Sequence, residues 1–354
     1  MRKEIDELTR KLENKDELNR KLMADVARQN VVIDDLNRKV NRMTSEVKYR
    51  SNETRENGDL FTGRRKIFVC GGRGEKCTLK TVESFSWPEN IWTPEPAMNI
   101  ERQAPASFLY ESQIYVSGGW TGYEFTDIIE MQRMDQEWIE APVKMPIKCR
   151  GHGIVCNEDK AILTGGRIDE DNISDGIYEI KLTPPYTTKL LTQLPERRYY
   201  HGCQIIDNEV VVVGGRTTKY TKDTQNTVYA YDINNNECKT LSPLPFPIAA
   251  MATVSYKGNV VLIGGHNEKG RTLNTVFMYE VKTGKIKMLP CLNHKRAASA
   301  AAITGNIIVV MGGYDCETKT CLSSVECLDL STNEWRKLPP MTSKRGYATA
   351  VLIC

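Results

Sequence analysis

The sequence predicts an all-β six-bladed propeller preceded by a long α-helical coiled coil, and three observations lead to this fold class. A Gly-Gly pair follows a short apolar run six times, at intervals of 47, 47, 49, 50 and 48 residues. Each interval resolves into four short strand-like segments. The first fifty residues lack glycine and proline and carry a heptad pattern. We therefore expect a coiled-coil helix over 1–50, a linker over 51–65 and a propeller over 66–354.

The heptad pattern of residues 1–50 predicts a parallel dimer. With Ile5 at position a, ten of the thirteen a and d positions are apolar. Such a stripe needs a partner helix, and β-branched residues at a with Leu at d favour two parallel strands. The alternative is a helix that packs on its own globular domain. The predicted homodimer seam consists of Ile5, Leu8, Leu12, Asn19, Leu22, Val26, Ile33, Leu36, Val40, Met43 and Val47.

Composition and charge argue against several classes of protein. The 354 residues are 40% hydrophobic and 26% charged, which is typical of globular proteins. Lys plus Arg is 48 and Asp plus Glu is 45, so no basic excess favours a nucleic-acid partner. No apolar run is long enough for a membrane span, and the charged N-terminus lacks a signal core. Eleven scattered cysteines without a C-x-x-C pair predict neither disulfides nor zinc. We expect a cytoplasmic protein.

Each repeat has the pattern of a four-stranded propeller blade. A strand of small residues and a tight polar turn precede the Gly-Gly strand, and two further strands follow it, the last ending near Leu-Pro. The first Gly-Gly pair has no small-residue strand before it, whereas residues 347–354 follow the last repeat. We expect this C-terminal strand to complete the first blade and close the ring. The glycines assigned to the structural repeat are Gly71, Gly72, Gly118, Gly119, Gly165, Gly166, Gly214, Gly215, Gly264, Gly265, Gly312 and Gly313.

These repeats resemble the kelch repeat family over residues 66–354. Three positions of the family pattern are recognisable, and the resemblance implies that they are structural, with Arg–Glu pairs and Trp wedges between blades. The Glu positions are Glu83, Glu130 and Glu326, and the Trp positions are Trp92, Trp138 and Trp335. The Arg positions are Arg102, Arg150, Arg198, Arg296 and Arg345, with Ile248 in the fourth repeat.

The resemblance also implies a ligand site on one rim of the propeller. In the family, peptides dock on the loops after Gly-Gly and on the residues after the repeated Arg. Arginines, histidines and aromatics there would suit an acidic peptide with an apolar anchor. The alternative for each residue is that it only completes its turn. The predicted partner-binding rim consists of Arg73, Trp120, Arg167, Arg216, His266, Tyr314, Gln103, His152, Tyr199, Tyr200 and Tyr347.

The sequence favours binding over catalysis. The four histidines, His152, His201, His266 and His294, lie in different repeats without metal-ligand spacing, and no phosphate-loop or dinucleotide motif is present. We therefore expect no enzyme activity, no cofactor and no metal.

The resemblance is closest to the kelch half of the kelch-like adaptors, which deliver substrates to cullin-type ubiquitin ligases. Their BTB and BACK domains have no counterpart in residues 1–65. The first hypothesis is therefore a substrate-recognition adaptor in the ubiquitin conjugation pathway. The alternative is an actin-binding cytoskeletal cross-linker, and a third possibility is a metal-dependent kelch enzyme.

Overall fold

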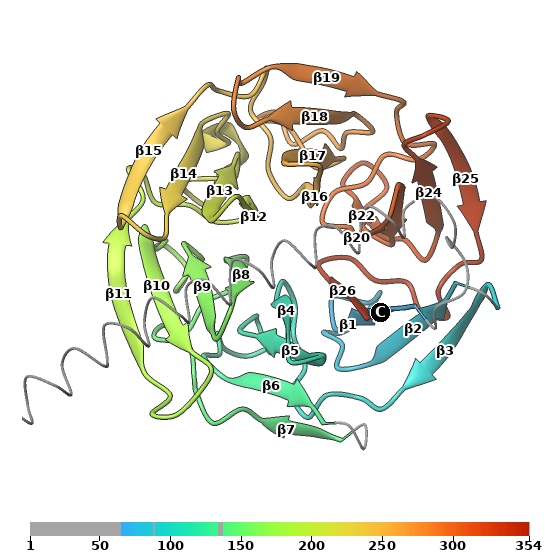
Figure 1. Cartoon of the computed structure of the whole chain (residues 1–354). Helices are drawn as coiled ribbons and strands as arrows, with labels where there is room; N and C mark the ends of the chain where they lie inside the picture. Colours follow the sequence, from blue (N-terminus) through green and yellow to red (C-terminus); the bar gives the residue numbers. More distant parts are fainter. Residues whose placement is uncertain (1–64, 88, 134–136, 354) are drawn as a thin grey trace, which may run out of the picture. The chain divides into compact units, whose positions relative to one another are not determined.

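The computed structural model describes residues 65–87, 89–133 and 137–353, which all belong to one compact unit. This unit contains six four-stranded antiparallel sheets arranged in a ring (Figure 1). The innermost strands of all six sheets line a central channel. The six-bladed all-β propeller is thereby confirmed. The predicted coiled-coil helix, its dimer seam and the linker up to residue 64 lie outside the described residues.

The second and third strands of each blade are the most buried part of the fold. The second strand is buried at nearly every position, which explains its continuous run of β-branched and aliphatic residues. The strands that line the channel are β26 (Thr349–Ile353), β4 (Ala106–Tyr110), β8 (Gly153–Asn157), β12 (Gly202–Ile206), β16 (Ala252–Tyr256) and β20 (Ala300–Thr304). The second strands are β1 (Lys66–Cys70), β5 (Gln113–Ser117), β9 (Lys160–Thr164), β13 (Glu209–Val213), β17 (Asn259–Ile263) and β21 (Ile307–Met311).

The two outer strands of each blade pass from the core to the solvent. The third strands are β2 (Val82–Ser86), β6 (Ile129–Gln132), β10 (Gly176–Lys181), β14 (Val228–Asp232), β18 (Val276–Glu280) and β24 (Val325–Asp329). The outermost strands are β3 (Ile91–Glu95), β7 (Trp138–Glu140), β11 (Thr188–Gln193), β15 (Glu237–Leu241), β19 (Ile286–Leu289) and β25 (Glu334–Leu338). A short hairpin, β22 (Tyr314–Asp315) with β23 (Thr320–Cys321), and the 3₁₀ turn η1 (Thr221–Asp223) lie in the connecting loops.

The blades are numbered here from blade 1, which contains both ends of the propeller. Its strand order is β26-β1-β2-β3, so the last strand of the chain pairs with the first (Figure 1). The pairing is antiparallel over the full length of both strands, from Lys66 opposite Ile353 to Cys70 opposite Thr349. Blades 2 to 6 each take all four strands from one repeat and begin with β4, β8, β12, β16 and β20. The ring is therefore closed by hydrogen bonds between sequence-distant strands.

Each Gly-Gly pair lies directly after a second strand, where the chain turns towards one rim. Both glycines of every pair have a positive φ, near 60° for the first and near 100° for the second, as in Gly165 (59°) and Gly166 (105°). A Cβ atom on Gly165 would lie 2.2 Å from the carbonyl oxygen of Arg198 in the next blade. Both the backbone conformation and the close approach of the neighbouring blade require glycine here.

Candidate functional site

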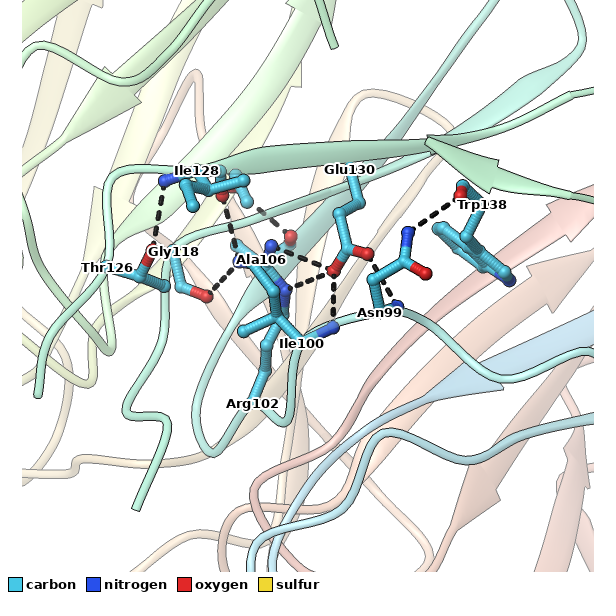
Figure 2. A network of polar contacts seen from close by, with 10 residues as sticks. Asn99, Ile100, Arg102, Ala106, Gly118, Thr126, Ile128, Glu130 and Trp138 are labelled. Atoms are coloured by element: carbon cyan, nitrogen blue, oxygen red, sulfur yellow. Dashed lines mark hydrogen bonds and ion pairs between the residues drawn. The ribbon is translucent and has the colours of Figure 1, made fainter. Parts of the chain in front are cut away.

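The contacts between neighbouring blades include a buried arginine that holds the Gly-Gly turn. Arg102 is fully buried, and its Nε and Nη2 atoms donate to one carboxylate oxygen of Glu130 at 3.1 and 3.0 Å (Figure 2). Its Nη1 atom donates to the carbonyl oxygens of Gly118 at 2.7 Å and Ile128 at 2.9 Å. This guanidinium group links two segments of blade 2 to the segment that precedes it, and its contacts are structural.

The same contact recurs at two further junctions. Arg296 contacts Glu326 at 2.6 Å, and Arg345 contacts Glu83 at 2.5 Å. Arg198 is also fully buried, but it contacts Glu196, the hydroxyl groups of Thr227 and Tyr229, and the Gly214 carbonyl oxygen. The Trp side chains also join blades, and each donates its indole N–H to a carbonyl oxygen of the preceding blade: Trp92 to Pro339, Trp138 to Pro96 and Trp335 to Pro290.

Arg150 does not occupy the buried arginine position, and its alignment with the other four arginines is wrong. The carbonyl oxygen that accepts from the second glycine belongs to Arg102, Arg198, Arg296 and Arg345 in four junctions but to Cys149 at Gly119. Arg150 lies one residue later and reaches the rim. A sequence signal could have shown this. Both repeats contain a His-Gly pair, His152-Gly153 and His201-Gly202, and aligning these pairs aligns Cys149 with Arg198.

A closed ring of six backbone hydrogen bonds surrounds the channel at this rim. Each blade contributes one residue with φ between 48° and 61°, whose N–H donates to the carbonyl oxygen of the corresponding residue in a neighbouring blade, at distances from 2.6 to 2.9 Å. Five of these residues are not glycine, so the ring holds backbone strain at the channel mouth. The repeat pattern did not predict the ring as a feature. Its residues, in chain order, are Ala104, Gly151, Tyr200, Ala250, Ala298 and Tyr347.

Two tyrosines of this ring reach across the channel mouth. Tyr200 belongs to blade 4 and Tyr347 to blade 1, which are opposite blades, yet their ring centroids are 5.6 Å apart. The other four ring residues have small side chains or none, which leaves room for this contact. Below the tyrosines, the channel has a volume of about 690 Å³ and is lined by all six innermost strands.

Aromatic side chains continue from this pair in both directions. Tyr199 lies 4.6 Å from Tyr200, and Tyr314 lies 6.1 Å from Tyr347, measured between ring centroids. The Arg73 guanidinium group lies 5.6 Å from the centroid of Tyr314. Four tyrosine rings thus lie in a row at the mouth, and the Arg73 guanidinium group lies at one end of this row.

The predicted residues after Gly-Gly lie at equivalent positions of the rim. Each forms an isolated antiparallel bridge with a residue of a neighbouring repeat, as in Arg167 with Arg150 and Arg216 with Tyr199. The residues placed there are Arg73, Trp120, Arg167, Arg216, His266 and Tyr314. Gln103 bridges to Trp120 from the other side, as Arg150 does to Arg167. The structure therefore brings the two predicted groups together around one mouth.

Three of the predicted rim residues are buried and do not present a surface. Tyr199 is 1% exposed, His266 4% and His152 5%, whereas Tyr200, Tyr347 and the rim arginines are partly exposed or exposed. His152 lies at the channel neck, where its Nε2 atom is 3.0 Å from the hydroxyl oxygen of Ser117. These three side chains therefore pack within the protein at the mouth and do not form its surface.

Burial keeps the histidines near the mouth neutral. It lowers the pKa of His152 to about 3, with a smaller contribution from Arg102, and that of His201 to about 3, with Arg198 contributing. Burial and the adjacent Arg216 also lower the pKa of His266 to about 3. The Arg216 Nη2 atom donates to His266 Nε2 at 2.6 Å, which is consistent with a neutral imidazole.

In residues 65–353 with their gaps, no group of three or more His, Cys, Asp or Glu side chains could hold a metal ion. No helix within the same residues is long and apolar enough to cross a membrane. Burial raises the pKa of the Cys149 thiol, and the Cys77 thiol is exposed.

Two family models match the chain. The KLHDC2/KLHL20/DRC7 Kelch-repeats domain matches residues 151–353, and the Kelch motif matches residues 62–99. Among curated proteins, alpha-scruin of Limulus polyphemus is 27% identical over 53% of this chain and 22% of its own length. Kelch-like protein 40 of Xenopus laevis is 25% identical over 58% of this chain and 34% of its own. Kelch-like protein terF of Aspergillus terreus is 26% identical over 59% and 49% respectively.

The chain covers between about a fifth and a half of the length of these relatives. The family assignment rests on the first model, which covers more than half of the chain and spans blades 3 to 6 together with the closing strand. The second model covers strands β1 to β3 of blade 1. With six Gly-Gly turns, the recurring buried arginine and the closure of blade 1 by β26, the chain belongs to the kelch-repeat family.

Proposed function

We propose that this protein is a non-enzymatic adaptor that binds a protein partner at the channel mouth. The observation that supports this most directly is the Tyr200–Tyr347 contact, which provides a partly exposed aromatic surface between rim arginines. Aromatic residues and arginines are the side chains most enriched among those that dominate binding energy in protein interfaces. The protein that binds at the mouth would be a substrate of a ubiquitin ligase, as the resemblance to kelch-like adaptors suggests.

We further propose that residues 1–50 dimerise the protein through the heptad seam. A dimer would present two mouths to one ligase or one substrate assembly, which raises the effective concentration of the second contact. The solution mass of the full chain tests this part. A dimer that becomes a monomer when Leu22 and Leu36 are replaced by Asp supports the seam, whereas a wild-type monomer contradicts it.

The partner proposal is tested by affinity purification from cells followed by mass spectrometry. The wild-type chain is compared with an Arg167→Ala, Arg216→Ala double variant, and Lys287→Ala on the outer strand β19 is the control. We expect a set of proteins that wild type and control capture and the double variant loses. If all three capture the same proteins, the mouth is not the recognition site.

The second candidate is a cytoskeletal cross-linker, in which a dimer would hold two actin filaments. It shares the two-mouth arrangement but requires filament binding. Co-sedimentation of the full chain with actin filaments at low salt separates the two functions. Pelleting with filaments favours the cross-linker, whereas absence of pelleting together with capture of ligase subunits favours the adaptor.

A further inference from the structure

The central channel has a side-chain lining that the proposed function does not use. Its volume is about 690 Å³, and all six innermost strands contribute to its wall. Binding sites for small molecules typically have volumes of roughly 300–1,000 Å³. None of the described residues that line the channel is Asp, Glu, Lys or Arg, and burial keeps its two histidines, His152 and His201, neutral. The channel therefore has the size of a ligand site and an uncharged wall.

A narrow neck lies directly below the Tyr200–Tyr347 contact, which crosses the mouth of the channel. The cavity in this neck has a volume of about 120 Å³. Each blade contributes one residue to the neck, at the position directly after its residue of the backbone hydrogen-bond ring. These neck residues are Pro105, His152, His201, Met251, Ser299 and Ala348.

Three polar atoms of the neck residues are buried without a hydrogen-bond partner among the described residues. They are Nδ1 of His152, Nδ1 of His201 and Oγ of Ser299, whose residues are 5%, 8% and 7% exposed. The other ring nitrogen of each histidine has a partner. Nε2 of His152 lies 3.0 Å from the hydroxyl oxygen of Ser117, and Nε2 of His201 lies 2.9 Å from that of Thr164. Because a buried polar group without a partner is destabilising, the neck favours a molecule that supplies hydrogen bonds.

The end of the channel opposite the mouth is mostly apolar. Side chains at every second position of a strand share a face, and in β20 the partly exposed positions are Ala301 and Ile303. These two residues line the channel, and the equivalents of Ile303 in the other blades are also partly exposed or exposed. Four of the six side chains in this layer are aliphatic, so the channel has an apolar opening. The layer consists of Leu109, Cys156, Ile205, Ser255, Ile303 and Leu352.

We propose that the channel binds an uncharged, elongated molecule with a polar head group and an apolar tail. The head group, an amide or a hydroxyl group, lies in the neck and supplies hydrogen bonds there. The tail lies against the aliphatic layer, which is four residues from the neck along β20, or ~13 Å at 3.3 Å per residue. The molecule enters from the end opposite the mouth, because the Tyr200–Tyr347 contact crosses the mouth itself. This site is separate from the proposed partner surface and does not depend on it.

The test is isothermal titration calorimetry of the full chain with three probes. Octanamide has both parts of the proposed ligand, octanoate has the same tail with a charged head group, and acetamide has the head group without the tail. Ala301→Phe fills the channel between the neck and the opening. Ser255→Phe narrows the opening at an exposed position, where the added ring does not disturb the core. The control is Met288→Phe, which adds the same ring to an exposed position of the outer strand β19.

We expect octanamide to bind wild type and Met288→Phe with equal affinity, and Ala301→Phe and Ser255→Phe about tenfold more weakly or less. Octanoate should not bind at the same concentrations, because its carboxylate would be buried against an uncharged wall. Acetamide should not bind either, because it buries no apolar tail. Absence of octanamide binding to wild type, equal affinity in all four proteins, or octanoate binding as tightly as octanamide overturns the proposal.

A matched pair of serine variants tests the place of the head group. Ser299→Ala removes a hydroxyl group from the neck, and Ser255→Ala removes one from the opening. Ser299→Ala should weaken octanamide binding about threefold or more, because the amide loses a hydrogen bond, whereas Ser255→Ala should leave the affinity unchanged. Equal affinities of the two variants would show that the head group does not lie in the neck, and would contradict the proposal.

Discussion

Arg345 and Glu83 form a buried ion pair that joins the last repeat to the first. The Arg345 side chain is fully buried, and its Nη2 atom is 2.5 Å from Glu83 Oε1. Glu83 also accepts hydrogen bonds from the backbone N–H groups of Thr342 and Ser343, at 2.7 and 3.2 Å. Because β26 and β1 close the ring in the same blade, this carboxylate holds together segments that are about 260 residues apart.

Removal of this carboxylate should destabilise the propeller strongly. In Glu83→Ala the Arg345 charge stays buried without its partner, which typically costs about 3–5 kcal/mol of unfolding free energy. The measurement is the urea concentration at which half of the propeller is unfolded. The control is Lys344→Ala, which breaks the exposed Lys344–Glu75 pair and should leave the midpoint nearly unchanged. Equal midpoints for the two variants would show that the junction does not depend on Glu83.

Deletion of residues 347–354 should open the ring. The deletion removes β26, exposes the inner edge of β1 and removes one of the six residues of the hydrogen-bonded ring. An unpaired strand edge promotes aggregation. We expect early proteolysis within blade 1 and a shift to larger species in size-exclusion chromatography. Val351→Ala, which retains the strand, is the matched control, and a deletion that remains as protease-resistant as this control would contradict closure by β26.

The sequence predicts the fold well because every blade repeats a local pattern. Each local pattern predicts one strand or turn of a blade, and the propeller is built by repeating these strands and turns. The patterns are the Gly-Gly pair, the strand of small residues before it and the additional C-terminal strand. The junction residues are less regular. Cys149 takes the buried arginine position while Arg150 follows it, so spacing alone led to the wrong register, and only the His-Gly pairs mark the correct one.

The structure brings the predicted rim residues together at one rim, but the sequence did not predict how they are arranged there. The contact between Tyr200 and Tyr347 joins opposite blades, and a repeat alignment compares equivalent positions without showing which of them meet across the axis. The backbone ring depends on positive φ at residues such as Ala250 and Ala298, and the residue type alanine does not predict a positive φ. Burial of His152, Tyr199 and His266 likewise follows from the neighbouring blade. The predictions for residues 1–50 remain predictions.

The buried histidines should make stability depend on pH below neutrality. The pKa of His152 is about 3 in the folded state, against 6.5 for the free side chain, so between these values the unfolded state binds the extra proton. Stability should therefore fall as the pH decreases from about 6.5 towards 3. His152→Gln should reduce this slope by up to about 1.4 kcal/mol per pH unit. His294→Gln, at an exposed position, is the control, and equal slopes for the two variants would place the dependence elsewhere.

Thiol labelling should separate the two cysteines that have basic neighbours in sequence. Cys149 is fully buried between blades, and burial raises the pKa of its thiol, which disfavours the reactive thiolate. Cys77 is exposed in the loop after the first Gly-Gly pair. Mass spectrometry after brief iodoacetamide treatment of the native protein should show modification of Cys77 and almost none of Cys149, with both modified after unfolding in urea. The Cys149 thiol packs against Gly166, where a Cβ atom would lie only 2.8 Å from the sulfur. If Cys149 is labelled as fast as Cys77 in the native protein, the junction beside Gly166 opens on the timescale of the labelling.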